Sequence, residues 1–257
     1  MNARSVSRFA AIIPARYSSS RFPGKPLVRI GNKTMIQRVY EQARKSLELV
    51  YVATDDERIF NAVKGFGGKA VMTSPDHFSG TDRCAEAIDK IVAETGVQID
   101  IVVNMQGDEP FIRPEQLVLL MNCFNSGGVE LATLIREAVP GEDIFNPNQP
   151  KVIVNALGDA IYFSRSVIPF IRDADKNEWT MKHVFYKHIG LYAYRSETLQ
   201  KITRLTRSPL EIAESLEQNR WIENGYRIRT AVTEWESIGI DTPEDLEKAK
   251  LILDQII

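Results

Sequence analysis

Three cationic side chains gather in one short loop near the beginning of the sequence: Arg16, Arg21 and Lys25. They come directly after Phe9–Pro14, a short apolar run that predicts a buried strand. In open α/β sheets, ligands bind beyond the carboxyl ends of the strands. Three cations there suit a triphosphate, since adjacent phosphates need several donors. A solvent-exposed basic turn would have the same spacing, so the sequence is compatible with a phosphate site and with such a turn.

The loop is not a Walker phosphate-binding loop. That pattern requires a glycine five residues before Gly24, where this chain has Ser19. It also requires Ser or Thr directly after the lysine, where this chain has Pro26. If phosphates bind here, they are held by another arrangement of backbone and cations.

A second polar segment, Asn104–Pro110 (NMQGDEP), also follows a hydrophobic run. Its two carboxylates, Asp108 and Glu109, are candidate ligands for Mg²⁺, which takes one or two carboxylates and leaves room for phosphate oxygens. A tight glycine turn that leads into a helix cap would explain the same residues without a metal site.

Strand-like and helix-like patterns alternate through the first half of the chain, which predicts a parallel sheet covered on both faces. We expect strands at 9–14, 50–54, 69–72 and 99–105, and helices at 34–45, from 55–56 through 63, 81–94 and 114–123. The second half breaks this rhythm. We expect a hairpin at 152–155 and 160–163, a strand at 189–194, a helix from Ser208 to about Asn224, and a last helix at 242–252. The fold class is thus α/β, as one domain over residues 1–257 with a smaller α+β insertion near 136–188.

Composition excludes several classes of protein. The chain has 257 residues, 44% of them hydrophobic and 26% charged, which is ordinary for a globular protein with a large core. Its net charge of −2 gives no general electrostatic reason to bind nucleic acid or an anionic membrane. No apolar run approaches the ~20 residues of a membrane span. Two cysteines and no visible signal peptide lead us to expect the reducing cytoplasm.

The motifs taken together resemble one family, the CMP-Kdo synthetases, which are the 3-deoxy-manno-octulosonate (Kdo) cytidylyltransferases of bacterial lipopolysaccharide synthesis. The matching segments run in the family's order from about residue 9 to 253: IIPARYSSSRFPGKPL, YVATDDERI, SGTDR, NMQGDEPFI, YFSRSVIPF, YKHIGLYAYR, SPLEIAESLEQNRW and IGIDTPEDLEKA. The resemblance implies a Rossmann-like, mostly parallel sheet of the nucleotide-diphospho-sugar transferase type, with an inserted dimerisation region.

The resemblance also implies site residues. Those for the nucleotide CTP are Pro14, Ala15, Arg16, Arg21, Lys25, Ser79, Gly80, Thr81, Arg83 and Gln106. Those for the sugar acid are Gln106, Arg165, His188, Tyr192, Glu217 and Gln218. Asp108 and Asp241 are implied ligands of Mg²⁺, and with Arg16 and Lys25 they form the implied catalytic set. Considered without the resemblance, Ser79 or Thr81 is a candidate helix cap, and Asp241 in the segment DTPED is another. With the resemblance, Asp241 is expected to be a metal ligand that also begins the helix.

The expected reaction joins CTP and Kdo into CMP-Kdo and pyrophosphate, and the expected assembly is a homodimer. Two alternatives remain within the family, namely the 8-amino analogue of Kdo and another sugar acid such as sialic acid. A glycosyltransferase of similar fold would want an Asp-x-Asp at a strand end, but Asp173-Ala-Asp175 lies in an irregular region. A non-catalytic nucleotide-binding module would bind CTP without turnover.

Overall fold

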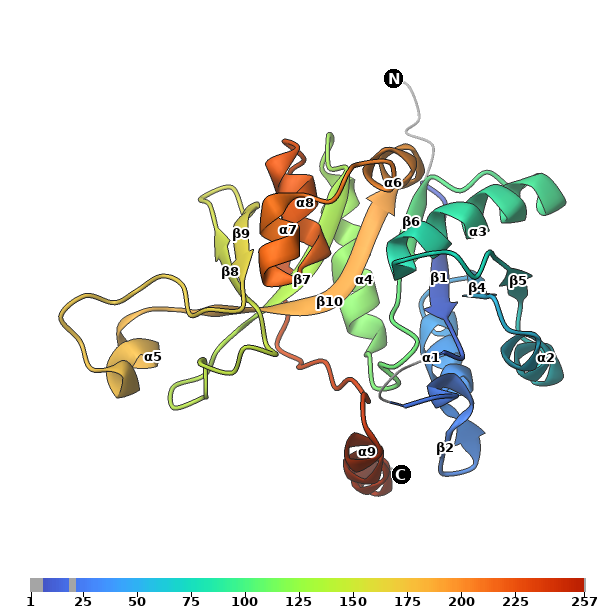
Figure 1. Cartoon of the computed structure of the whole chain (residues 1–257), viewed down its shortest axis with the longest axis horizontal. Coiled ribbons are helices and arrows are strands. Elements are labelled where there is room, and N and C mark those ends of the chain that lie inside the picture. Colours follow the sequence, from blue (N-terminus) through green and yellow to red (C-terminus); the bar gives the residue numbers. More distant parts are fainter. Residues whose placement is uncertain (1–6, 19–21, 257) are drawn as a thin grey trace. The chain divides into compact units, whose positions relative to one another are not determined.

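The computed structural model describes residues 7–18 and 22–256. The chain divides into two compact units (Figure 1). The described residues of Met1–Val118, Ala193–Thr203 and Ser237–Ile257 form the first unit, and Leu119–Tyr192 with Arg204–Glu236 form the second. The expected insertion at 136–188 lies within the second unit, which begins earlier and takes in a later segment as well. The description as one domain with an insertion stays a prediction.

The first unit is built around four parallel strands: β1 (Phe9–Ala15), β4 (Leu49–Thr54), β5 (Ala70–Met72) and β6 (Ile101–Asn104). Their order is β5-β4-β1-β6, and Ile12 of β1 lies opposite Tyr51 of β4 and Asn104 of β6. These runs are almost wholly apolar because helices cover both faces of a parallel sheet. The four predicted strands are confirmed.

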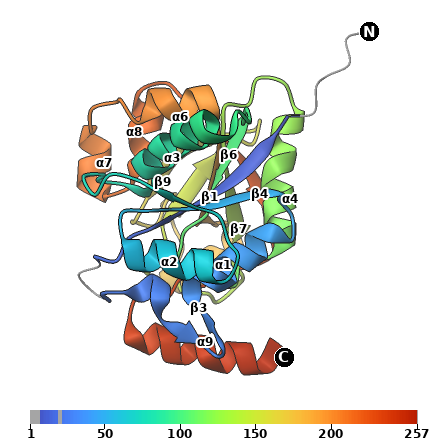
Figure 2. The same ribbon diagram turned by 90° about the vertical axis from the view of Figure 1, so that its right-hand side faces the viewer.

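Three helices connect these strands: α1 (Met35–Arg44), α2 (Glu57–Gly65) and α3 (Gly80–Thr95). Figure 2 shows α3 on the opposite side of β1 and β4 from α1 and α2. The chain moves outward from β1 to β4 and β5, then returns to β6 on the other side of β1. Strand order therefore reverses at β1, which creates the crevice where ligands bind in folds of this class. The predicted α/β fold with a mostly parallel sheet and helices on both faces is confirmed.

A small satellite core completes the first unit. It joins the last helix, α9 (Pro243–Ile256), to the short hairpin of β2 (Arg29–Ile30) and β3 (Lys33–Thr34), which follows the 3-10 turn η1 (Lys25–Leu27). The cluster consists of Ile30, Met35, Ile240, Leu246 and Ala249, with Phe22, Val28 and Phe111 packed against it. Two segments more than 200 residues apart in sequence are thereby fixed side by side. The short helix α6 (Ser196–Ile202), which the sequence did not predict, packs on α3.

The second unit is a mixed α+β structure. Its strands are β7 (Leu131–Glu137), β8 (Lys151–Val154), β9 (Ala160–Ser164), β10 (Tyr186–Arg195), whose last residues belong to the first unit, and β11 (Ile228–Val232). β7 and β11 are parallel, whereas β8 and β9 form the predicted hairpin, which turns at Gly158 with φ 79°. The short helices are α5 (Trp179–Lys182), α7 (Pro209–Glu214) and α8 (Glu217–Glu223); α4 (Pro114–Asn122) and the turn η2 (Cys123–Asn125) lead into this unit.

The helix expected from Ser208 to about Asn224 is broken in the middle, so that prediction is wrong. Helix α7 ends at Glu214, its C-cap Ser215 has φ 51°, and Leu216 is extended with φ −128° before α8 begins. The carboxylate of Glu214, the last residue of α7, accepts hydrogen bonds from Ser164 Oγ (2.6 Å) and the Arg165 backbone N–H (2.9 Å). These bonds to a distant strand hold the helix end in place, and helical spacing in the sequence does not report them.

Replacing Ser215 by glycine is expected to stabilise the protein. A side chain in the left-handed region costs about 1–2 kcal/mol, and glycine recovers most of this while losing about 0.5–1 kcal/mol of chain entropy. Denaturant unfolding should give a midpoint that is unchanged or higher for Ser215→Gly, and clearly lower for the β-branched Ser215→Val. A glycine variant less stable than the valine variant would contradict this account of the break.

Candidate active site

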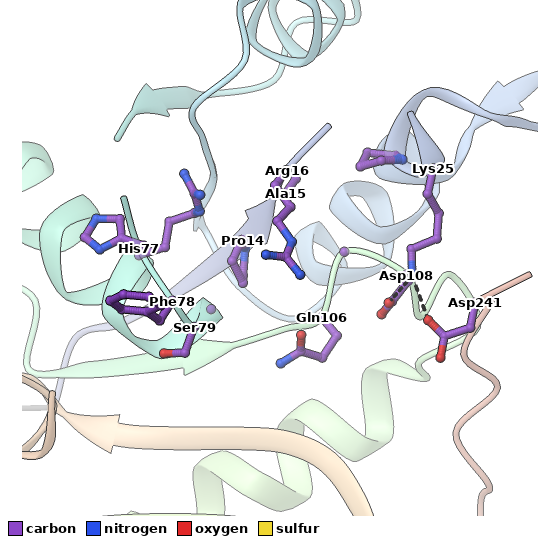
Figure 3. A pocket seen from close by; sticks show the side chains of 14 residues that line it. Pro14, Ala15, Arg16, Lys25, His77, Phe78, Ser79, Gln106, Asp108 and Asp241 are labelled. Atoms are coloured by element: carbon purple, nitrogen blue, oxygen red, sulfur yellow. Dashed lines mark hydrogen bonds and ion pairs between the residues drawn. The ribbon is translucent and has the colours of Figure 1, made fainter. Parts of the chain in front are cut away.

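A pocket of the first unit opens at the carboxyl ends of β1 and β6, where the strand order reverses (Figure 3). Its walls come from the ends of these strands, the turn η1, the loop before α3 and the segment before α9. The lining residues are Pro14, Ala15, Arg16, Lys25, Pro26, His77, Phe78, Ser79, Gly80, Arg83, Gln106, Gly107, Asp108 and Asp241. Segments that lie far apart in the sequence therefore meet around one cavity.

Two glycines allow the walls of the pocket to approach the end of β1. A Cβ on Gly107 would lie 2.9 Å from the carbonyl oxygen of Pro14, closer than real Cβ contacts allow. A Cβ on Gly80 would lie 3.1 Å from Pro14 Cγ. The loop after β6 and the first turn of α3 thus both rest on Pro14, and any larger residue would push them away from it.

A cation between two carboxylates dominates one side of the pocket. Lys25 Nζ donates to Asp108 Oδ2 at 2.5 Å and to Asp241 Oδ1 at 3.0 Å. Burial alone would lower the pKa of Lys25, but the two carboxylates outweigh it and raise the pKa above its usual value. Lys25 is consequently always charged near neutral pH, and the two carboxylates face a single positive centre.

The position of Asp241 is fixed by its neighbours in the chain. The Ile240 backbone N–H donates to the carbonyl oxygen of Asp108 at 3.0 Å, and Ile240 is part of the satellite core under α9. The cap of α9 is Thr242, whose Oγ1 accepts from the Asp245 N–H while the Asp245 carboxylate accepts from the Thr242 N–H. The expectation that Asp241 itself opens the helix is wrong, and its carboxylate faces Lys25 instead.

The loop that carries the predicted cations is closed at its base. The Gly24 N–H donates to the Tyr17 carbonyl oxygen at 2.9 Å, and Gly24 adopts φ 72° directly above the Tyr17 ring. The Arg58 guanidinium covers that ring at 3.3 Å from its centroid and is itself bound by Asp56. The closed base of the loop positions Lys25 at the pocket. The predicted residue Arg21 lies outside the described residues.

Helix α3 organises the wall formed by the SGTDR segment. Ser79 is its cap, in a reciprocal capping box with Asp82. Arg83 is 3% exposed and donates to Thr73 Oγ1 (2.5 Å) and Asp55 Oδ2 (3.1 Å), so its guanidinium is engaged by the chain itself. Ser79, Gly80 and Arg83 line the pocket as predicted, whereas Thr81 is buried on α3 and is not a lining residue. The prediction of Ser79 as a cap is confirmed.

One turn further along α3, Glu86 holds the loop in front of the helix. Its carboxylate accepts from the Ser74 backbone N–H at 2.8 Å, contacts the ring Nε2 of His77 and pairs with Lys90 at 2.7 Å. Burial alone would raise the pKa of Glu86, but Lys90, Ser74 and His77 together lower it to about 2. The loop that presents His77 and the strongly exposed Phe78 is therefore tied to an ionised carboxylate.

The second acidic residue of the NMQGDEP segment has a different environment from Asp108. Glu109 is not a lining residue of the pocket, and burial together with the charge of Asp108 raises its pKa to about 7. Within residues 7–18 and 22–256, no three His, Cys, Asp or Glu side chains form a metal-binding cluster. Of the carboxylates proposed from the sequence for Mg²⁺, the pair that the structure brings together is Asp108 and Asp241.

In the second unit, two of the predicted sugar-binding residues lie side by side on β10. The rings of His188 and Tyr192 are 5.2 Å apart between centroids, and Tyr192 meets the ring of Trp221 on α8 edge-on at 5.3 Å. His188 Nε2 lies 3.1 Å from Thr133 Oγ1 on β7. Burial lowers the pKa of His188 to about 3, so this ring is neutral at physiological pH.

The remaining predicted sugar-binding residues have distinct surroundings. The Arg165 guanidinium donates to the carbonyl oxygens of Glu214, Pro147 and Ser215, rather than to a carboxylate. Glu217 pairs with Arg220 on α8. Gln218 is 5% exposed, and its buried Nε2 has no hydrogen-bond partner among the described residues. Both Glu217 and Gln218 begin α8, so the expectation that they share a helix with Ser208 is wrong.

The structure thus groups the predicted nucleotide residues closely and adds four that sequence reasoning missed: Pro26, His77, Phe78 and Gly107. His77 stands two residues before the SGTDR segment, and Gly107 stands within NMQGDEP, so both lay inside or beside motifs already singled out. His77 in particular carried a signal, because it stands beside the SGTDR segment, which the resemblance implies for CTP binding. Gln106 lines the pocket as expected.

Comparison with known proteins agrees with this geometry. Residues 10–230 match the cytidylyltransferase family. The chain therefore belongs to the cytidylyltransferases.

Within that class the similarity is specific. A 3-deoxy-manno-octulosonate cytidylyltransferase of Parabacteroides distasonis is 57% identical over 252 residues, covering 96% of this chain and 99% of that protein. Another of the same name from Cytophaga hutchinsonii is 58% identical over 239 residues, covering 92% and 94%. A solved structure of CMP:2-keto-3-deoxy-manno-octonic acid synthetase complexed with CTP superposes with a TM-score of 0.88 at 44% identity, covering 98% of this chain and 100% of that one. The chain is a member of the 3-deoxy-manno-octulosonate cytidylyltransferase family, and the resemblance stated from its motifs is confirmed.

None of the helices in the described part of the chain is both long and apolar enough to cross a bilayer.

The low pKa of His188 predicts a specific acid sensitivity. Below pH 6.5 the unfolded chain takes up a proton at this residue, whereas the folded chain does so only near pH 3. The stability that the neutral buried ring contributes is therefore present above pH 6.5 and is lost as the pH falls toward 3. In denaturant unfolding between pH 7 and pH 4, the free energy of unfolding should fall less steeply for His188→Asn than for wild type. Identical pH slopes would mean that His188 titrates normally.

Proposed function

We propose that the protein transfers CMP from CTP to the anomeric hydroxyl of Kdo and releases pyrophosphate, as a step of lipopolysaccharide synthesis. The observation that carries this proposal is the convergence of Lys25, Asp108 and Asp241 at the switch point of the sheet, in a chain of this family. We place the reaction in the cytoplasm, which agrees with the two free cysteines, Cys84 and Cys123.

The cations of the pocket have a definite part in this reaction. The sugar-acid nucleophile and CTP are both anions, so the site must offset their repulsion while it aligns the attacking oxygen with the α-phosphorus. Arg16, at the end of β1, and Lys25 supply positive charge where negative charge develops on the departing pyrophosphate. Gln106 offers a neutral amide between them and the loop before α3 (Figure 3). Electrostatics and positioning account for the rate, without a dedicated protein base.

Asp108 and Asp241 fit a magnesium ion. Two carboxylates that already share one cation, set beside an open cavity, offer the all-oxygen donors that Mg²⁺ takes, with space left for water and phosphate oxygens. The chemistry that such an ion supplies is charge neutralisation on the phosphates and a lower pKa of the attacking hydroxyl. Asp108 and Asp241 would hold it, and Lys25 would then be free to turn toward phosphate.

The choice of Kdo over other sugar acids is assigned to the second unit. The buried Nε2 of Gln218, which has no hydrogen-bond partner within the described part of the chain, is a donor that a sugar hydroxyl or carboxylate would satisfy. Since His188 is neutral, it offers a hydrogen bond but no charge to the sugar acid. The 8-amino analogue of Kdo and sialic acid remain the alternative substrates.

We further propose that the active form is a homodimer through the second unit. Phe170 (74% exposed) and Met181 (68%) protrude beside a small buried core of Ile144, Trp179 and Phe185. An apolar groove lined by Val152, Ile168, Met181, Val184 and Phe185, among others, continues this surface. Large apolar side chains exposed together mark an interaction surface, and a second copy of the chain is the partner we assign to it.

Substituting Asp108 by asparagine is expected to leave the fold intact and to lower kcat at least ~100-fold, because one of the two carboxylates loses its charge. Pyrophosphate release with CTP, Kdo and a magnesium titration measures this. Asp89→Asn, a charge-matched change on α3 outside the pocket, is the control. Turnover of Asp108→Asn within a fewfold of wild type would remove Asp108 from the proposed metal site.

The substrate is identified by running the same assay with Kdo, 8-amino-Kdo and sialic acid in parallel. We expect rapid pyrophosphate release with Kdo alone. Pyrophosphate release with the amino sugar and not with Kdo would support the proposed phosphate site and contradict the sugar specificity assigned to the second unit. No release with any of the three, while CTP still binds, would favour a non-catalytic module.

The proposed dimer makes a separate prediction. A Phe170→Glu, Met181→Glu double variant should run as a monomer in light scattering at concentrations where wild type is a dimer, since it places charge on the apolar surface. Ile212→Glu, at a similarly exposed position on α7, is the control and should stay dimeric. A wild-type protein that is monomeric throughout would overturn the assignment.

A further inference from the structure

The pocket has two chemically different sides. Lys25, Asp108 and Asp241 lie together on one side, and His77, Phe78 and Ser79 lie together on the other (Figure 3). In the proposed function the anionic phosphates belong with the cations, which leaves the uncharged base for the side with His77. Phe78 is 97% exposed there, and an open aromatic ring is a surface on which a base stacks.

The tautomer of the His77 ring on this side is set by its partner. Glu86 contacts the ring at Nε2 and also accepts from the Ser74 backbone N–H and Lys90. With its pKa near 2, Glu86 is ionised at neutral pH and can only accept hydrogen bonds. The ring proton of neutral His77 must therefore sit on Nε2, so that Nδ1 carries a lone pair.

The free nitrogen is available to a ligand. Among the described residues, the hydrogen bonding of the His77 ring consists of its contact with Glu86, and no protein group bonds to Nδ1. His77 is also a lining residue of the pocket. A ring that borders the pocket thus carries a hydrogen-bond acceptor, and a carboxylate fixes the tautomer of that ring.

We propose that His77 selects cytosine by accepting a hydrogen bond at Nδ1 from the exocyclic amino group of the base, and that Glu86 is the positioning residue that holds the neutral ring as the tautomer with its proton on Nε2. Uracil carries a carbonyl oxygen where cytosine carries the amino group. With uracil in place, two hydrogen-bond acceptors would face each other, which disfavours binding. The inference rests on the proposed function, because it concerns the base of the same nucleotide.

Equilibrium binding of CTP and of UTP, measured by calorimetry on the full chain, tests the inference directly. His77→Phe keeps a flat ring without nitrogen atoms, and its preference for CTP over UTP should fall at least ~10-fold relative to wild type, mainly through weaker CTP binding. The ratio of kcat/KM for the two nucleotides with Kdo should fall in parallel.

Glu86→Gln gives the sharper test. Glutamine keeps the shape and an oxygen for the Ser74 N–H, but its amide group can also donate to Nε2, which allows the proton to move to Nδ1. This variant should lose most of the preference for CTP through weaker CTP and stronger UTP binding. A purely structural role for Glu86 would not strengthen UTP binding. Glu94→Gln, an exposed position on the same helix, should leave the ratio unchanged.

Thermal unfolding of each variant separates altered recognition from altered folding. The inference would be overturned if both variants bound CTP and UTP more weakly by the same factor, or if wild type bound the two nucleotides equally. If wild type releases no pyrophosphate with CTP and Kdo, the proposed function fails; the binding ratios still decide the role of His77, because they need no turnover.

Discussion

The site depends on one ion cluster, the Lys25 ammonium held between the carboxylates of Asp108 and Asp241. Each of the three side chains comes from a different part of the chain: the loop after β1, the loop after β6 and the segment before α9. Two acidic groups placed together would repel each other without a cation between them. The satellite core under α9 and the closed base of the loop after β1 supply the packing that keeps the three groups together. Much of the first unit therefore serves to hold these three side chains in place as a frame around the cluster.

The sequence predicted the parts of this frame that depend on local patterns. Apolar runs marked β1, β4, β5 and β6, helical spacing marked α1 to α4, and the Gly158 turn marked the hairpin of β8 and β9. The cations of the loop after β1 and the carboxylates after β6 were found because they follow strand ends, where ligands bind in this fold class. The proposed nucleotide residues Ser79, Gly80, Thr81 and Arg83 came from the family resemblance alone. The resemblance to a family was needed to connect Asp241 with Asp108, since 133 residues separate them and no periodicity relates them.

What the sequence could not predict depends on tertiary contacts. The break at Ser215 follows from bonds between Glu214 and a distant strand, and the identity of the cap of α9 follows from which of two adjacent residues faces Lys25. The short strand β11 pairs with β7 across almost 100 residues, and neither strand has an alternating pattern of its own. The low pKa of His188 likewise arises from burial, which the alternation along β10 indicates only weakly.

Pro14 touches both walls of the pocket proposed for the nucleotide, because Gly107 and Gly80 bring the loop after β6 and the start of α3 against it. The walls are consequently not two independent flaps that close on a ligand, but parts of one rigid cradle. A nucleotide entering such a cradle loses its own freedom of motion while the protein loses little more of its own. Affinity then arises from contacts already in place, and discrimination between bases depends on the fixed directions of hydrogen-bonding groups. Base selection of this kind tolerates few substitutions at the two glycines, even though neither has a side chain with which to touch the ligand.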